Sequence, residues 1–256
     1  KKMSKSRGNV VNPWDHFNKE GTDAIRWYMT SQSAPWNPMN FDPNGVRETY
    51  AKMFLTLWNV HRFHLDYAIL DNFDYSKDFI PVGKRNALDR WILSRVSSVA
   101  ENYHDQYVSW EFHKAARELE NFVINDLSNW YVRRSRRRLW DEAESHDKRA
   151  CQFTLHEILL TVSKLMAPIA PFMPDKIHFD LTGTSVHTAD WPLGSDLVDK
   201  NLPPQDLELE KEMSIVRMLA ETGRKIRVEA KRRQRLPCKE GWIVGCLLYT
   251  SPSPRD

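Results

Sequence analysis

The pattern of apolar and polar positions predicts a chain that is helical along almost its whole length. Apolar residues recur every three or four positions through several long segments, and this spacing is typical of one buried face of an α-helix. We expect long helices from about residue 43 to 61 and over 88–103, 110–140, 146–165 and 207–233, together with shorter ones over 22–31 and ending near residue 181. The pattern therefore predicts a mainly α fold.

Local signals mark where several of these helices start. Thr22 or Asp23 is a candidate N-terminal cap for the helix that ends near residue 31, because short polar side chains accept hydrogen bonds from the first free backbone N–H groups. Within that helix, Trp27 and Tyr28 are expected to be core residues. The prolines at 35 and 38 then predict a loop before the next helix.

A polar segment separates the first helices from the later ones. Residues 71–87 show no apolar period and contain Pro81 and Gly83, so we expect a domain boundary near residue 83. His61 and His64 fall within the apolar stripe of the preceding helix. Because a single helical histidine without a partner more often packs than reacts, both are expected to be structural.

Composition narrows the class of protein only slightly. The chain has 256 residues, of which 41% are hydrophobic and 28% charged, which is ordinary for a soluble globular protein of one or two domains. No run of apolar residues is long enough to predict a membrane span, and there is no signal peptide. Cys151, Cys238 and Cys246 form no CxxC pair, which argues against a disulfide framework and against a zinc site in this segment. A reducing cytosol fits this cysteine usage.

The first candidate site is the short cationic segment at residues 2–6 (KMSKS), which is followed by Arg7 and Gly8. Ammonium and hydroxyl groups on a mobile loop suit a polyphosphate, because they can follow charge that moves during phosphoryl or nucleotidyl transfer. The alternative is a basic, frayed terminus, since charge runs are usually solvated.

The second candidate site is a run of five arginines within residues 133–138, flanked by Trp130 and Trp140. At about 100° per residue, Arg134 and Arg137 continue the apolar face that ends at Trp130. Either the arginines pair with carboxylates at a domain edge, or they face a polyanion. The guanidinium fork suits phosphate, and the flanking aromatic rings are able to stack on bases. The residues alone leave both interpretations open.

Several segments together resemble a known family. They are residues 2–6 (KMSKS) with the following GNVV, 21–28 (GTDAIRWY), 33–37 (SAPWN), 127–140 (LSNWYVRRSRRRLW) and 185–192 (SVHTADWP). Their order and content resemble the class I aminoacyl-tRNA synthetases, and most closely the isoleucyl-tRNA synthetases. Asn12 stands where that family more often has Asp.

The resemblance implies roles for individual residues. In the family, the second lysine of the motif, here Lys5, contacts the ATP phosphates and stabilises the transition state of adenylation. Lys2, Ser4 and Ser6 would support the loop and the nucleotide. In the helical domain, the implied contacts to tRNA are Trp130, Arg133, Arg134, Arg137 and Arg138. Some of these arginines are expected to be architectural.

The resemblance also implies a fold and a division into domains. Residues 1–45 would form the C-terminal end of a Rossmann-type catalytic domain, 46–87 a connecting helix and linker, and 88–245 an α-helical-bundle anticodon-binding domain. Residues 246–256 match nothing in the family and are expected to be a non-native read-through tail.

The activity implied is that of an isoleucine–tRNA ligase. Such an enzyme joins isoleucine to ATP, with Mg²⁺, and transfers the aminoacyl group to tRNA(Ile). We expect the chain to be the C-terminal part of a larger, monomeric, cytosolic enzyme, because a phosphate-binding loop needs a scaffold and none precedes it here. The HIGH-type motif, the amino-acid pocket and the editing domain of such an enzyme are missing. The fragment alone is expected to be inactive.

The sequence leaves three alternative assignments of the chain open. The chain could derive from a valyl- or leucyl-tRNA synthetase, which the amino-acid pocket would decide. It could be a stand-alone RNA-binding module, for which the KMSKS segment would have no use. It could also be a purely structural bundle whose arginines are all paired, which predicts no salt-dependent RNA affinity.

Overall fold

The computed structural model describes residues 10–77, 79–140, 145–192 and 205–233, together with Met3, Ser6, Leu236 and Glu240. Over these residues the chain is helical and contains no β-strand, so the predicted mainly α fold is confirmed. In the same part of the chain, no helix combines the length and apolar character needed to cross a membrane. The chain divides into two compact units, Lys1–Glu210 and Lys211–Asp256.

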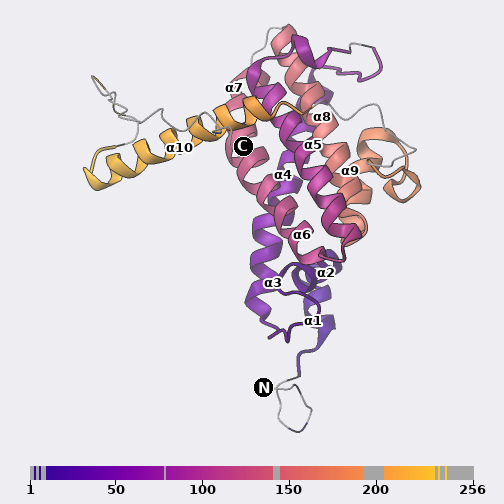
Figure 1. Cartoon of the computed structure of the whole chain (residues 1–256). Helices are drawn as coiled ribbons and strands as arrows, with labels where there is room; N and C mark the ends of the chain where they lie inside the picture. Colours follow the sequence, from indigo (N-terminus) through magenta and orange to yellow (C-terminus); the bar gives the residue numbers. More distant parts are fainter. Residues whose placement is uncertain are drawn as a thin grey trace, which may run out of the picture. The chain divides into compact units, whose positions relative to one another are not determined.

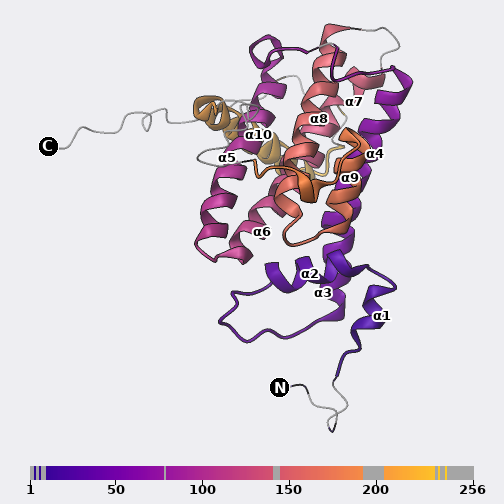
Figure 2. The same cartoon turned by 90° about the vertical axis from the view of Figure 1, so that its right-hand side faces the viewer.

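The first unit is a bundle of long helices with shorter ones at its ends. Its elements are α1 (Pro13–Phe17), α2 (Thr22–Ser31), α3 (Pro43–Thr49), η2 (Tyr50–Phe54), α4 (Leu55–Leu70), η3 (Val82–Lys84), α5 (Ala87–Val108), α6 (Phe112–Asn121), η4 (Phe122–Val132), α7 (Arg133–Trp140), α8 (His146–Met166), α9 (Phe172–Thr182) and η5 (Val186–Thr188). The helices α4, α5, α6–η4 and α8 pack against one another (Figure 1). Figure 2 shows α1, α2 and α3 together at the end of the bundle where the chain begins.

The last helix, α10 (Leu207–Glu229), begins in the first unit and continues into the second. Its start is tied to α5, because Asp206 N donates to Ser94 Oγ at 2.8 Å and Arg95 Nη1 donates to Glu210 at 3.1 Å. The helix predicted over 207–233 is confirmed, but it ends at Glu229, slightly earlier than expected.

Two of the long helices contain widened turns. Residues Pro43–Leu70 form one helix through the π-helical segment η2, and Phe112–Trp140 form another through η4. The apolar spacing predicted both long helices, the first of them only as far as about residue 61. It did not predict the widened segments, because π-helical turns carry no distinct pattern in sequence.

Short polar side chains cap the N-terminal ends of three helices, α3, α5 and α8. The side chain of Asp42 accepts a hydrogen bond from Asn44 N, and those of Asn86 and Ser145 do the same for α5 and α8. Such caps satisfy backbone N–H groups that have no partner inside the helix, and each typically contributes about 1 kcal/mol. The sequence thus defines the starts of the long helices locally.

The predicted cap of α2 is wrong. Gly21 occupies the cap position with φ +85°, a left-handed conformation that favours glycine, and no side chain caps the helix. The carboxylate of Asp23 instead accepts hydrogen bonds from the backbone of Phe172 at 3.1 Å and of Met173 at 2.7 Å. Asp23 therefore caps α9, because the free N–H groups at the start of α9 lie within its reach.

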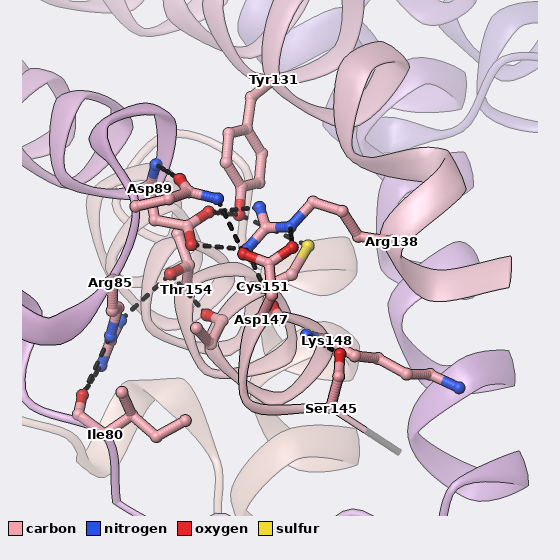
Figure 3. A network of polar contacts seen from close by, with 12 residues as sticks. Ile80, Arg85, Asp89, Tyr131, Arg138, Ser145, Asp147, Lys148, Cys151 and Thr154 are labelled. Carbon is pink, nitrogen blue, oxygen red and sulfur yellow. Dashed lines mark hydrogen bonds and ion pairs between the residues drawn. The ribbon is translucent and has the colours of Figure 1, made fainter. Parts of the chain in front are cut away.

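The expected core residues are buried. Trp27, Tyr28, Met53 and Leu57 are all at most 2% exposed. The buried side chain of Arg85 fastens the segment before α5, since its guanidinium donates to the carbonyl oxygen of Ile80 and to Thr154 (Figure 3). Such fully used arginines hold polar segments of the chain against the bundle.

The histidines of α4 are structural, as predicted. His61 and His64 are each 1% exposed, and the rings of His64 and His156 lie 5.8 Å apart. Burial, reinforced by the neighbouring histidines, lowers the pKa of His64 to about 3. Burial alone lowers the pKa of His156 to about 4. The core therefore holds these imidazoles in their neutral form.

Candidate nucleic-acid interface

The KMSKS segment lies mostly outside the described residues. This applies to Lys2, Ser4 and Lys5, whereas Ser6 is described and is exposed. The roles expected for these four residues stay predictions.

Two short helices follow the motif in sequence, and the second is attached to the bundle. Asn12 caps the first, α1, because its side chain accepts a hydrogen bond from Trp14 N at 3.2 Å. In α2, Arg26 donates to the carbonyl oxygen of Ile169 at 2.6 Å, and Trp27 donates to Glu120 at 3.2 Å. Helix α2 is thereby attached both to the end of α8 and to α6.

A further arginine approaches α2 from the bundle side. Arg117 of α6 donates to the carbonyl oxygens of Ser31 at 2.6 Å and Gln32 at 2.5 Å. These are the last carbonyl groups of α2, which have no partner inside that helix. With the Asp23 cap of α9, the contact fixes both ends of α2 against later helices.

The arginine run forms α7 and divides into two groups. Arg138 points inward and is clamped by two carboxylates (Figure 3). Its two terminal nitrogens each donate to Asp89 at 2.7 Å, and its Nε donates to Asp147 at 2.7 Å. Asp89 is fully buried and also accepts a hydrogen bond from the Tyr131 hydroxyl at 2.6 Å. Arg138 therefore joins α5, α7 and the start of α8.

Electrostatics agree with a structural role for Arg138. Burial of the guanidinium opposes its charge, but the hydrogen bonds to Asp89 and the electrostatic attraction of Cys151, Tyr131 and Asp89 together outweigh burial and raise the pKa of Arg138. Burial likewise raises the pKa of Tyr131, and the neighbouring Asp89 adds to the effect. The arginine is charged and the tyrosine neutral at any physiological pH. The charge of Arg138 is therefore used in contacts within the protein.

Arg134 and Trp130 form a second pair. The guanidinium carbon of Arg134 lies 3.1 Å from the centre of the Trp130 ring, as in a cation–π contact. Trp130 is only 6% exposed, whereas Arg134 is exposed. Arg134 thus continues the face of Trp130, as the helical spacing predicts, but it covers the ring.

The remaining arginines point outward. Arg133, Arg136 and Arg137 are exposed, and Trp140, which follows at the next helical turn, is 57% exposed. In the part of the chain that the structure describes, the three guanidinium groups have no ion-pair partner. We call these four residues the outer stripe. Its cations are available to a polyanion such as a nucleic-acid backbone.

The outer stripe ends at a groove between α4 and α7. The groove has a volume of about 490 Å³, and its lining residues are Phe63, Asp66, Tyr67, Leu70, Arg136 and Trp140. Arg136 and Trp140 are not among the site residues predicted from the sequence, although their helical spacing from Arg133 is a signal for them. No local signal identifies the α4 side of the groove.

Two family models match the chain, and both describe class I tRNA ligases. "tRNA synthetases class I (I, L, M and V)" matches residues 1–42, and "Anticodon-binding domain of tRNA ligase" matches residues 89–241. The second match extends over more than half of the chain. The chain therefore belongs to the family of anticodon-binding domains of class I tRNA ligases.

Individual relatives specify the family further. The chain is 41% identical over 243 residues to the isoleucine–tRNA ligase of Cytophaga hutchinsonii, covering 92% of the chain and 21% of that protein. It is 44% identical over 216 residues to the isoleucine–tRNA ligase of Porphyromonas gingivalis, covering 83% of the chain and 19% of that protein. The chain is thus homologous to isoleucine–tRNA ligases and spans about a fifth of their length.

One solved structure supports the fold. It is the LeuRS of Agrobacterium radiobacter K84 in a ternary complex with tRNA and LeuAMS, which superimposes with a TM-score of 0.57 at 20% identity. The match covers 77% of this chain and 22% of that chain. At this identity the likeness concerns the helical architecture only.

Proposed function

We propose that the chain is part of an isoleucine–tRNA ligase, which activates isoleucine with ATP and transfers it to tRNA(Ile). The homology to isoleucine–tRNA ligases along most of the chain supports this assignment over a valyl- or leucyl-tRNA ligase. In the first step, an isoleucine carboxylate oxygen attacks the α-phosphorus of ATP and pyrophosphate leaves. In the second, a ribose hydroxyl of the tRNA attacks the activated carbonyl carbon and AMP leaves.

In this proposal Lys5 stabilises the charge that develops on the phosphates, assisted by Lys2, Ser4 and Ser6. A lysine ammonium aimed at a transferring phosphate group lowers the barrier because its charge is already in place. Mg²⁺ would accompany ATP and neutralise phosphate charge. Helix α2, which follows the motif in sequence, is attached to α6, to the end of α8 and to α9.

The RNA-binding part of the proposal rests on the outer stripe. Arg133, Arg136 and Arg137 are the observation that carries it, because they are exposed cations on one face of a domain matched as anticodon-binding. Arg134 adds positive charge above Trp130. Arg138 supports the face from the inside through Asp89.

A salt titration tests RNA binding. The 256-residue chain is titrated with the anticodon stem-loop of tRNA(Ile) and with a valine stem-loop that differs by one anticodon base. We expect preference for the isoleucine stem-loop and a steep fall in affinity with salt, since phosphate contacts release counterions. Affinity independent of salt, or no binding by the folded chain, would contradict the proposal.

A second experiment tests the role of Lys5 in a full-length ligase that carries this segment. Lys5→Ala should reduce isoleucine-dependent ATP–pyrophosphate exchange about 10²- to 10³-fold, as for removal of one preorganised electrostatic donor. Lys19→Ala, which removes an exposed lysine just after α1, is the matched control and should leave the rate unchanged. Equal rates for both variants would remove Lys5 from the mechanism.

A further inference from the structure

The groove between α4 and α7 has features that the phosphate-binding role of the outer stripe does not explain. Phosphates require cations, but this groove is mainly aromatic and apolar, with Phe63, Tyr67, Leu70 and Trp140 in its lining. Leu70 is 72% exposed and Trp140 57% exposed, so both surfaces are open to a partner. Large apolar side chains are exposed here next to three arginines, Arg133, Arg136 and Arg137, that have no ion-pair partner among the described residues. This combination suggests a partner with both charge and a flat apolar surface.

The geometry of the rings fits a flat occupant. Phe63 and Tyr67 lie on one turn of α4 with ring centres 5.0 Å apart and an angle of 62° between the rings. They stabilise each other as an edge-on pair. The indole of Trp140 comes from the facing helix, at the end of α7. Aromatic side chains of this kind are the surfaces on which proteins stack unpaired bases.

The two charged residues of the groove add chemical selectivity. Asp66 is exposed and shares the groove with Arg136 of the opposite helix. A carboxylate repels phosphate, but it accepts hydrogen bonds from the exocyclic amino group of a base. Arginine supplies the complementary donors to ring nitrogen and carbonyl acceptors. The pair therefore favours the edge of a base that carries an amino group.

We propose that this groove binds a single unstacked nucleobase bearing an exocyclic amino group, that is cytosine, adenine or guanine but not uracil. Trp140 stacks on the base, Asp66 accepts from its amino group, and Arg133 and Arg137 hold the neighbouring phosphates. The inference rests on the proposed tRNA binding and deepens it, because it assigns base recognition and phosphate contact to different residues.

The test separates these two contributions by their salt dependence. In the 256-residue chain, Trp140→Ala should weaken binding of the isoleucine stem-loop about 5- to 150-fold, which corresponds to the loss of one stacked base. The slope of affinity against salt should not change, because stacking releases no counterions. Trp36→Ala removes another exposed tryptophan, at 68%, which contacts His113 of α6 and does not line the groove, and it should have no effect.

A fluorescent base gives a direct readout. The stem-loop is prepared with 2-aminopurine at each loop position in turn, and quenching at one position on binding is expected for the wild-type chain and not for Trp140→Ala. Asp66→Ala should reduce the discrimination between a loop with cytosine at that position and one with uracil. Circular dichroism of each variant confirms that it is folded.

Four results would overturn the inference. Unchanged affinity of Trp140→Ala, with wild-type binding still dependent on salt and arginines, would remove the base site while the proposed function stood. Equal affinity for a fully paired stem would do the same. If Trp140→Ala altered only self-association in sedimentation, the groove would be a protein contact. No RNA binding by the folded wild-type chain would overturn both proposals.

Discussion

Helix α7 carries one kind of side chain in two different environments. Arg138 faces the bundle and is held by Asp89 and Asp147, whereas Arg136 and Arg137 beside it are exposed and have no ion-pair partner among the described residues. The difference arises from the neighbouring helices, since α5 supplies a buried carboxylate to the inner face. A run of like residues therefore does not have one function; each position takes the function of the surface that it faces.

The largest expected loss of stability comes from breaking the ion pair between Arg138 and Asp89 on the inner side of α7. Arg138→Met leaves the buried carboxylate of Asp89 without its partner, and such a change typically costs about 3–5 kcal/mol in free energy of unfolding. Urea unfolding of the 256-residue chain measures it. Arg137→Met, on the outer side, should change stability by no more than about 0.5 kcal/mol.

A double variant sharpens the interpretation. Replacing both partners, as Asp89→Leu with Arg138→Met, should recover part of the loss, because no unpaired charge is then buried. A similar loss of stability for Arg137→Met and Arg138→Met would show that the two sides of α7 do not differ in the way the contacts indicate.

The bundle also buries polar side chains in their neutral form, and acid should destabilise the fold by protonating them. His64 and His156 have pKa values lowered to about 3 and about 4, against 6.5 in a free side chain. Protonation therefore favours the unfolded chain. Their contribution is complete above pH 6.5 and is lost as the pH falls from 6.5 towards 4, at up to about 1.4 kcal/mol per pH unit for each histidine.

At pH 5 we therefore expect a loss of about 2–4 kcal/mol from these two residues. The measurement is urea unfolding between pH 7 and 5. The double variant His64→Phe/His156→Phe keeps the ring packing and should show a shallower pH dependence in this range. The same slope in the wild type and in the variant would assign acid sensitivity to other groups.

Arg117 of α6 is an intermediate case, because it donates to carbonyl oxygens of α2 and pairs with no carboxylate of the described residues. Removing it leaves two carbonyl groups at a helix end, which water can reach in part. Arg117→Ala should therefore cost about 1–2 kcal/mol, less than Arg138→Met. Thermal unfolding of both variants measures the comparison. A larger loss than that of Arg138→Met would reverse the order.

The smallest effect on stability is expected on the outer stripe, where the effect on RNA is largest. Arg133→Gln and Arg137→Gln should each leave the free energy of unfolding unchanged within about 0.5 kcal/mol. Each should reduce the salt slope of RNA binding by about one, uniformly for different sequences. Arg138→Lys retains the charge at the inner position and serves as control. If only that variant changed the slope, the outer stripe would not be the contact surface.

The sequence predicted the long helices well because the information for them is local. Apolar spacing predicted Phe112–Trp140 almost to its ends, and it predicted the helix that begins at Pro43 as far as about residue 61, although that helix continues to Leu70. Asn86 and Ser145, which cap α5 and α8 in the structure, are local signals of the same kind. The resemblance of the motifs identified the family before any contact was known.

The site was predicted only in part because its contacts are distant in sequence. The partner of Arg138 lies 49 residues away at Asp89, and Asp23 caps a helix about 150 residues away. Nothing in the arginine run distinguishes position 138 from position 137. The α4 wall of the groove likewise becomes visible only when α4 is placed beside α7.

The widened segment η4 has a consequence for how this protein family can vary in length. A π-helical turn, with its i→i+5 hydrogen bonds, holds about one residue more than an α-helical turn. A helix can lose that residue by tightening the turn, so that the residues beyond it keep their orientation. A deletion within Phe122–Val132 should thus preserve the alignment of Arg138 with Asp89, whereas a deletion within α7 would rotate the following side chains by about 100°. Gaps in alignments of relatives are therefore expected to be tolerated in η4 and avoided in α7.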